Sequence, residues 1–182
     1  MKTDTIINPI PTVMKLLEEL DTLGYHATLI GGTALIIMGS DRVTKDADFL
    51  MIKSARDQRE LIHAFYRNGF EIISKLNEKK EVVRTVDNAN VAFARLQMDE
   101  HVSVFFYNHE IKFRIDALFD FPYSAAEVRA RATKKKVEGV NIYIASIDDL
   151  IRMKEIAYAD RKKSTDLQDL EFLKSLKAET KL

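Results

Sequence analysis

Two aspartates in the first third of the chain have the spacing of metal ligands. Asp46 and Asp48 lie two residues apart, where a polar loop gives way to the apolar run F-L-M-I. If this run is a strand, both carboxylates project from the same face, with Cα atoms roughly 6.5–7 Å apart. Carboxylate oxygens at that separation suit Mg²⁺ or Mn²⁺, either as one shared ion or as a bridged pair. The spacing therefore predicts a divalent-metal site.

A glycine pair upstream supplies a complementary feature. Gly31 and Gly32 follow a short strand-like run at 26–30 and precede a buried helix expected at 33–38. Glycines let backbone amides approach a ligand closely, and the helix start at Thr33 offers unpaired N–H groups that suit phosphate. Paired carboxylates beside a phosphate loop would repel the phosphate without a cation. Together they predict metal-assisted, in-line phosphoryl chemistry.

The elements that must position these residues form a mixed pattern. Apolar runs predict strands beginning at 26, 46, 102 and 111, one or two strands with a polar turn at 77–81, and a strand or hairpin around Gly139. Helical spacing predicts helices at 13–23, 33–38, 54–67 and 123–132, the third of them capped by Ser54. Two further helices are expected, one capped by Ser146 and a last one that begins at Asp166. We therefore expect an α+β fold, a mixed sheet flanked by helices. Its core would span 1–145, with C-terminal helices at 146–182 packed on it, or the whole would be one domain.

The segment from 30 to 49 resembles the signature of the DNA polymerase β-type nucleotidyltransferase superfamily. That signature is Gly-Gly or Gly-Ser, an interval, and then Asp-x-Asp; here 13 residues separate Gly32 from Asp46. The pattern R-x-T-x-D-x-D from Arg42 further resembles a small bacterial group that contains abortive-infection (AbiEii-type) toxins and relatives of antibiotic nucleotidyltransferases. The resemblance implies a nucleotidyltransferase fold, a nucleoside triphosphate substrate and Mg²⁺ or Mn²⁺.

The resemblance also implies a third acid on a later strand. Asp116 in F-R-I-D-A-L is the best match, as metal ligand and as the base that activates the acceptor, and alternation places Arg114 on its face. Asp120 is the runner-up. Arg42 and Thr44 become candidates for nucleotide binding with Gly31, Gly32 and Thr33, although Arg42 equally suits an ion pair and Thr44 a loop contact.

The C-terminal segment carries a weaker part of the same resemblance. Lys154 matches a lysine that holds nucleotide phosphates in the family, and Asp166 and Asp169 match an Asp-x-x-Asp-Leu helix beside the site. The chain departs from the family where Thr165 replaces a basic residue. Asp166 could instead be a helix N-cap, and Asp169 a surface residue.

Composition narrows the cellular setting. The chain of 182 residues has 28 basic and 28 acidic side chains, so a nucleic-acid substrate would need a local basic patch. The lack of cysteine excludes disulfides, thiolate metal sites and cysteine nucleophiles. No signal peptide and no run long enough to span a membrane is visible, so we expect a cytoplasmic protein with no membrane partner.

Several function classes stay open at this stage. The leading hypothesis is a toxin-like enzyme that moves a nucleoside monophosphate to an RNA or protein hydroxyl, with room for an antitoxin partner. An antibiotic nucleotidyltransferase and a non-catalytic nucleotide-binding or partner-binding module are the alternatives. The aromatic run at 105–107 is interpreted as strand packing rather than a base-stacking surface, and the lysines at 134–136 as a solvated turn.

Overall fold

An eight-stranded mixed sheet forms the centre of the computed structural model, which describes residues 8–52, 58–96 and 102–180. The strand order is β4-β3-β5-β6-β2-β1-β8-β7. The β2–β6 and β1–β8 pairs are parallel, and the other neighbours are antiparallel. The strands are β1 (Thr28–Ile30), β2 (Asp46–Met51), β3 (Glu71–Leu76), β4 (Val82–Val86), β5 (Ser103–Asn108), β6 (Phe113–Phe119), β7 (Thr133–Val137) and β8 (Val140–Ile144).

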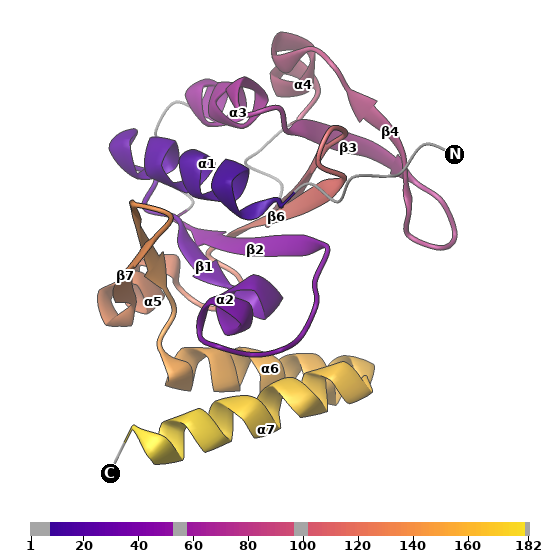
Figure 1. Cartoon of the computed structure of the whole chain (residues 1–182). Helices are drawn as coiled ribbons and strands as arrows, with labels where there is room; N and C mark the ends of the chain where they lie inside the picture. The colour runs from indigo at the N-terminus through magenta and orange to yellow at the C-terminus, as the bar shows by residue number, and fades with distance from the viewer. Residues whose placement is uncertain (1–7, 53–57, 97–101, 181–182) are drawn as a thin grey trace.

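Helices cover both faces of this sheet. They are α1 (Ile10–Thr22), α2 (Gly31–Ile37), α3 (Gln58–Arg67), α4 (Ala89–Arg95), α5 (Ala125–Arg131), α6 (Ile147–Arg161) and α7 (Ser164–Glu179). Figure 1 shows α1 and α3 on one side of the central strands, and α6 and α7 side by side on the other. Among the described residues, no helix is long and apolar enough to cross a membrane.

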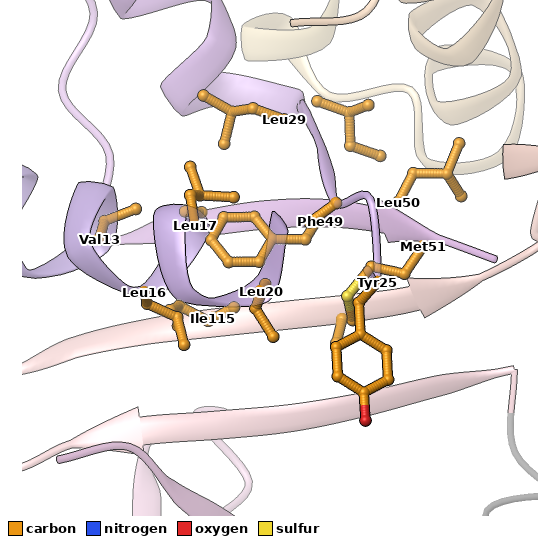
Figure 2. Packing of buried hydrophobic residues seen from close by; sticks show 14 of the residues in the cluster. Val13, Leu16, Leu17, Leu20, Tyr25, Leu29, Phe49, Leu50, Met51 and Ile115 are labelled. Carbon is orange, nitrogen blue, oxygen red and sulfur yellow. The ribbon is translucent and has the colours of Figure 1, made fainter. Parts of the chain in front are cut away.

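The core lies between α1 and the sheet. The buried residues of α1 include Val13, Leu16, Leu17 and Leu20, whose spacing places them on one helical stripe. Figure 2 shows this stripe against Phe49 of β2, with neighbouring side chains from β1 and β6. Because side chains alternate along a strand, turning Phe49 into this core sends its neighbours to the opposite face.

Most of the predicted elements are present, with differences at particular places. The mixed sheet, the turn at 77–81, the hairpin around Gly139 and the cap by Ser146 are confirmed. Helix α2 begins at Gly31 rather than Thr33. Helix α4 was not predicted, and the lysines at 134–136 form strand β7 rather than a turn. The predicted cap at Ser54 lies outside the described residues.

The C-terminal helices share the core of the preceding strands. Leu150 of α6 and Leu173 of α7 belong to the same buried cluster as Phe49. The packing shows no gap at Ser146. The predicted boundary that divides 1–145 from 146–182 therefore stays a proposal.

Candidate active site

One row of residues crosses four strands of the sheet. Ile30 of β1 lies opposite Asp48 of β2, Asp48 opposite Asp116 of β6, and Asp116 opposite Phe105 of β5. Asp46 lies two residues before Asp48 and so faces the same side, away from the α1 core. The fold thus brings the three predicted acids together on one face, beside the turn that follows Ile30.

Close packing of carboxylates changes their acidity. Burial, followed by the charges of Asp116 and Asp46, raises the pKa of Asp48 from 3.8 to about 7. Burial also raises the pKa of Asp116, although the neighbouring Arg114 opposes the change. Both shifts arise first from burial, which disfavours the charged carboxylate, and the neighbouring acids add to them.

Arg114 is the cation closest to two of the acids. Its Nη2 lies 2.6 Å from Oδ2 of Asp116 and 3.7 Å from Oδ2 of Asp46. Arg114 was not predicted as a site residue, although strand alternation already placed it on the face of Asp116. Its guanidinium carbon also lies 5.6 Å from the ring centre of Phe105.

The donor atoms fit a hard divalent ion. Oδ1 of Asp116 is buried without a hydrogen-bond partner, as a carboxylate oxygen reserved for a cation would be. Within the described ranges, no group of three or more histidine, aspartate or glutamate side chains is arranged so that it could hold a metal ion as it stands. Arg114 donates a hydrogen bond to the other oxygen of Asp116. An ion would compete with this guanidinium.

The glycine pair makes room for the acids and for Arg42. Gly31 has φ of +66°, and a Cβ atom built on it would lie 1.8 Å from Oδ2 of Asp48. A Cβ atom on Gly32 would lie 2.8 Å from Cζ of Arg42. A side chain at Gly31 would therefore collide with Asp48 in a backbone conformation that favours glycine, whereas at Gly32 the nearest atoms are the end of the Arg42 side chain. Their role as a phosphate loop stays a prediction.

The two predicted threonines contact Asp46. The Thr33 hydroxyl donates to the backbone carbonyl of Asp46 at 2.7 Å, and Thr33 is buried. The Thr44 hydroxyl donates to Oδ1 of Asp46 at 2.6 Å. Both hydroxyls therefore hold the start of β2 in place, and neither is directed at a separate phosphate position in this arrangement.

A polar cleft of about 240 Å³ opens over the acids. Six of the predicted residues line it, namely Gly32, Arg42, Asp46, Asp48, Asp116 and Lys154. Arg114, Arg161 and Lys163 add further positive charge to its walls. Five basic side chains thus line the cleft together with four aspartates, Asp46, Asp48, Asp116 and Asp166.

Helix α7 closes the cleft through buried acids. Asp169 pairs with Arg42 and, at 2.6 Å, with Lys154. Asp166 lies 3.3 Å from Lys154 and 3.1 Å from Arg161. The alternatives of an N-cap and a surface residue are therefore wrong, because Lys163 is the N-cap of α7 and both aspartates are buried. Sequence reasoning left them undecided, since their partners lie on other elements.

An apolar pocket of about 360 Å³ adjoins the cleft. Asp48, Lys154 and Arg161 line both spaces. The rest of the pocket is mainly hydrophobic and includes Leu118, Phe121 and Met153. Sequence reasoning missed this pocket because its walls come from β6, the following loop and α6. Asp120, the runner-up for the third acid, accepts a hydrogen bond from the amide of Ala125 and lines neither space.

Comparison with known proteins agrees with this fold. A family model described as "Nucleotidyl transferase AbiEii toxin, Type IV TA system" matches residues 15–182. A search of curated proteins finds no match.

Solved structures with the same fold are distant in sequence. An antigenic nucleotidyltransferase-like protein from Paracoccidioides brasiliensis is 16% identical, with a TM-score of 0.60 over 91% of this chain and 75% of that one. The antibiotic-resistance factor ANT(2'')-Ia is 13% identical, with a TM-score of 0.60 over 95% and 88% of the two chains. The lincosamide antibiotic adenylyltransferase LnuA, with lincomycin bound, is 12% identical, with a TM-score of 0.56 over 91% and 96%.

Proposed function

The chain belongs to the nucleotidyl transferase AbiEii toxin family and is a nucleotidyltransferase, and from this premise we propose that it transfers a nucleoside monophosphate from a nucleoside triphosphate to an acceptor hydroxyl with Mg²⁺ or Mn²⁺. The observation that carries the proposal is the register of Asp48 opposite Asp116, with Gly31 packed against Asp48. This arrangement supports the proposal because it brings carboxylates and a close-approach turn to one point.

The two adjoining spaces suit the two halves of the donor nucleotide. The polar cleft would hold the triphosphate, with Arg42, Lys154 and Arg161 facing its charges and the amides of the Gly31–Gly32 turn close to the acids. The apolar pocket would take the nucleoside, since it opens from the same Asp48 and is walled by hydrophobic side chains. Lys154 lines both spaces and would therefore sit near the phosphate groups.

Asp46, Asp48 and Asp116 would hold the metal. A bound divalent ion would neutralise the carboxylates and the phosphate oxygens, which otherwise repel one another. The orphaned oxygen of Asp116 and the crowding of Asp48 by two other acids support this assignment, because a cation would satisfy the oxygen and offset the repulsion.

Asp116 would also take the proton of the acceptor hydroxyl. The acceptor oxygen would form a bond to the α-phosphorus as the bond to the bridging oxygen breaks, and pyrophosphate would leave. A carboxylate whose pKa is raised by burial accepts a proton more readily than an exposed one. Positioning and charge neutralisation would supply most of the rate enhancement.

Label transfer tests this proposal. The protein would be incubated with each α-labelled nucleoside triphosphate, Mg²⁺ or Mn²⁺, and separate panels of tRNA, cell proteins, aminoglycosides and lincosamides. We expect transfer to one acceptor class, and a loss of at least about 100-fold in Asp46→Ala/Asp48→Ala. Asp41→Ala is the matched control, because Asp41 is an exposed acid in the loop before β2.

The outcomes separate the remaining alternatives. Transfer to RNA or protein supports a toxin-like role, for which an antitoxin would be the regulatory partner, whereas transfer to an antibiotic supports a resistance enzyme. Transfer that continues in the double variant, or without divalent metal, would contradict the metal site. Binding of nucleotides without any transfer would favour a non-catalytic module.

A further inference from the structure

Arg114 and Asp116 form an ion pair that leaves part of each group unused. Nη2 of Arg114 donates to Oδ2 of Asp116 at 2.6 Å. Oδ1 of Asp116 and Nε of Arg114 are both buried without a hydrogen-bond partner. An arginine that pairs permanently with a carboxylate commonly makes two parallel hydrogen bonds, which would satisfy atoms of this kind. Because buried polar atoms without partners are destabilising, this single bond is open to replacement by another cation.

The same nitrogen also serves a second acid. Nη2 of Arg114 lies 3.7 Å from Oδ2 of Asp46, which is an ion-pair distance but longer than a hydrogen bond. Asp46 is the register partner of Arg114 across the parallel β2–β6 pair. One cationic nitrogen therefore faces two of the carboxylates proposed to hold the metal, and it offsets part of their charge when no ion is bound.

A second position for the guanidinium lies on the neighbouring strand. Phe106 of β5 is buried and stacks on Phe65 of α3, whereas Phe105 points to the opposite face and is 39% exposed. The prediction of strand packing is thus confirmed for Phe106 and wrong for Phe105. Phe105 is the register partner of Asp116 and therefore a diagonal neighbour of Arg114. The guanidinium carbon lies 5.6 Å from the centre of the Phe105 ring, within the range of a cation–π contact.

We propose that Arg114 is a displaceable counter-ion of the metal site, an inference that rests on the proposed binding of a divalent ion by the three acids. In the metal-free protein Arg114 holds Asp116 and Asp46 together against their mutual repulsion. When a divalent ion binds, the guanidinium leaves Asp116 and moves onto the ring face of Phe105. Arg114 is therefore a positioning residue that sets the affinity of the site for the ion.

The exchange weakens the site for a bare ion and favours an ion that binds together with the donor nucleotide. Binding of the ion alone must break the contact between Arg114 and Asp116, which lowers the affinity. A nucleoside triphosphate adds phosphate oxygens, and protein sites for Mg²⁺ commonly combine one or two carboxylates with substrate phosphates. These added ligands favour the exchange, so the donor and the ion bind cooperatively.

Calorimetric titration with Mn²⁺ in the absence of nucleotide measures the affinity directly. Arg114→Met should bind Mn²⁺ at least about tenfold more tightly than the wild type, because a competing charge-assisted hydrogen bond is removed. Arg114→Lys keeps the charge and should lie between the two. Arg161→Met is the matched control, since Arg161 lines the same cleft but pairs with Asp166, and it should gain much less affinity. An unchanged or weaker affinity in Arg114→Met, or an equal gain in Arg161→Met, would overturn the proposal.

Fluorescence follows the movement itself in a protein that retains Arg114. The chain contains no tryptophan, so Phe105→Trp introduces a single fluorophore beside the guanidinium. We expect Mg²⁺ to change its emission as the guanidinium moves onto the ring, because tryptophan forms the strongest cation–π contacts. The emission of Phe105→Trp/Arg114→Met should not respond to Mg²⁺. The same response in both proteins, or none in the single variant, would contradict the movement.

The variant Asp46→Ala/Asp48→Ala distinguishes failure of this inference from failure of the proposed metal site. If the wild type binds Mn²⁺ and the double variant does not, but Arg114→Met gains no affinity, the role of Arg114 is wrong and the metal site stands. If the double variant binds Mn²⁺ as tightly as the wild type, both proposals fail. They also fail together if the wild type binds no Mn²⁺ with or without a nucleoside triphosphate.

Discussion

At Asp48 the proposed role in metal binding and the stability of the fold oppose each other. Its carboxylate is surrounded by Asp116 and Asp46 and is largely removed from water, and its pKa rises to about 7. At neutral pH, ionisation of Asp48 therefore costs more free energy in the folded protein than in the unfolded chain. A bound divalent ion would remove this disadvantage.

The pH dependence of stability follows from that shift. Between about pH 4, the pKa of an unfolded aspartate, and pH 7, native Asp48 keeps a proton that the unfolded chain has released. The free energy of unfolding should therefore fall as pH rises through this window when no metal is present. Asp48→Asn should be more stable than the wild type at pH 8 and should lack this contribution. Thermal unfolding scans in a chelating buffer would show it, and a lower Tm for Asp48→Asn at pH 8 would contradict it.

Gly31 provides a test of the contact with Asp48. Gly31→Ala should lower transfer activity about 100-fold, because the added Cβ would force Asp48 from its position. Gly39→Ala is the control, since Gly39 also has a positive φ but nothing lies within 4 Å of the place that its Cβ atom would take. Both variants carry backbone strain of about 1 kcal/mol. Steady-state kinetics should show much lower activity in Gly31→Ala than in Gly39→Ala, and urea unfolding should show similar stability for the two variants.

At the scale of elements, α7 is attached to the loop before β2 by charge. Asp169 joins Arg42 of that loop to Lys154 of α6, and the Asp169 side chain is only 6% exposed. This buried group connects three separate segments. It also fixes two of the cations proposed to meet the triphosphate.

Removing the buried acid should cost stability. Asp169→Asn should lower the free energy of unfolding by about 3 kcal/mol, because Arg42 and Lys154 would lose a shared counter-charge in a site with little water. Urea denaturation measures the change. Glu171→Gln, an exposed change on the same helix, should have little effect. Equal stabilities of the two variants would contradict the structural importance of the Asp169 pairs.

Much of the site could be predicted from local sequence patterns, but the contacts between distant parts of the chain could not. Alternation around Asp46 and Asp116 placed the acids on strand faces, because a period of two is readable from neighbours alone. The burial of Asp169 was not readable, since its partner Arg42 lies 127 residues away. Helix α4 was missed because its seven residues show no clear periodicity and depend on a cap by Asn88.

At the scale of the whole molecule, the C-terminal helices should unfold together with the sheet. Leu173→Ala should lower the free energy of unfolding by about 3 kcal/mol, because Leu173 is fully buried in the common core. Leu167→Ala on the same helix is the control, as Leu167 is 41% exposed. Far-UV circular dichroism and tyrosine fluorescence should report one coincident transition. Two separate transitions would instead support a domain boundary near Ser146.

The edges of the sheet decide how copies of this molecule behave in concentrated solution. With a net charge of zero, no overall repulsion keeps the copies apart near neutral pH. Strand β7 places the lysines 134–136 along one edge, and the register of β4 with β3 at the other edge is irregular. Like charges and bulges both oppose strand addition. Polymerisation into a continuous intermolecular sheet is therefore disfavoured at both edge strands. The lysines and the irregular register provide this protection, which the neutral composition does not reveal.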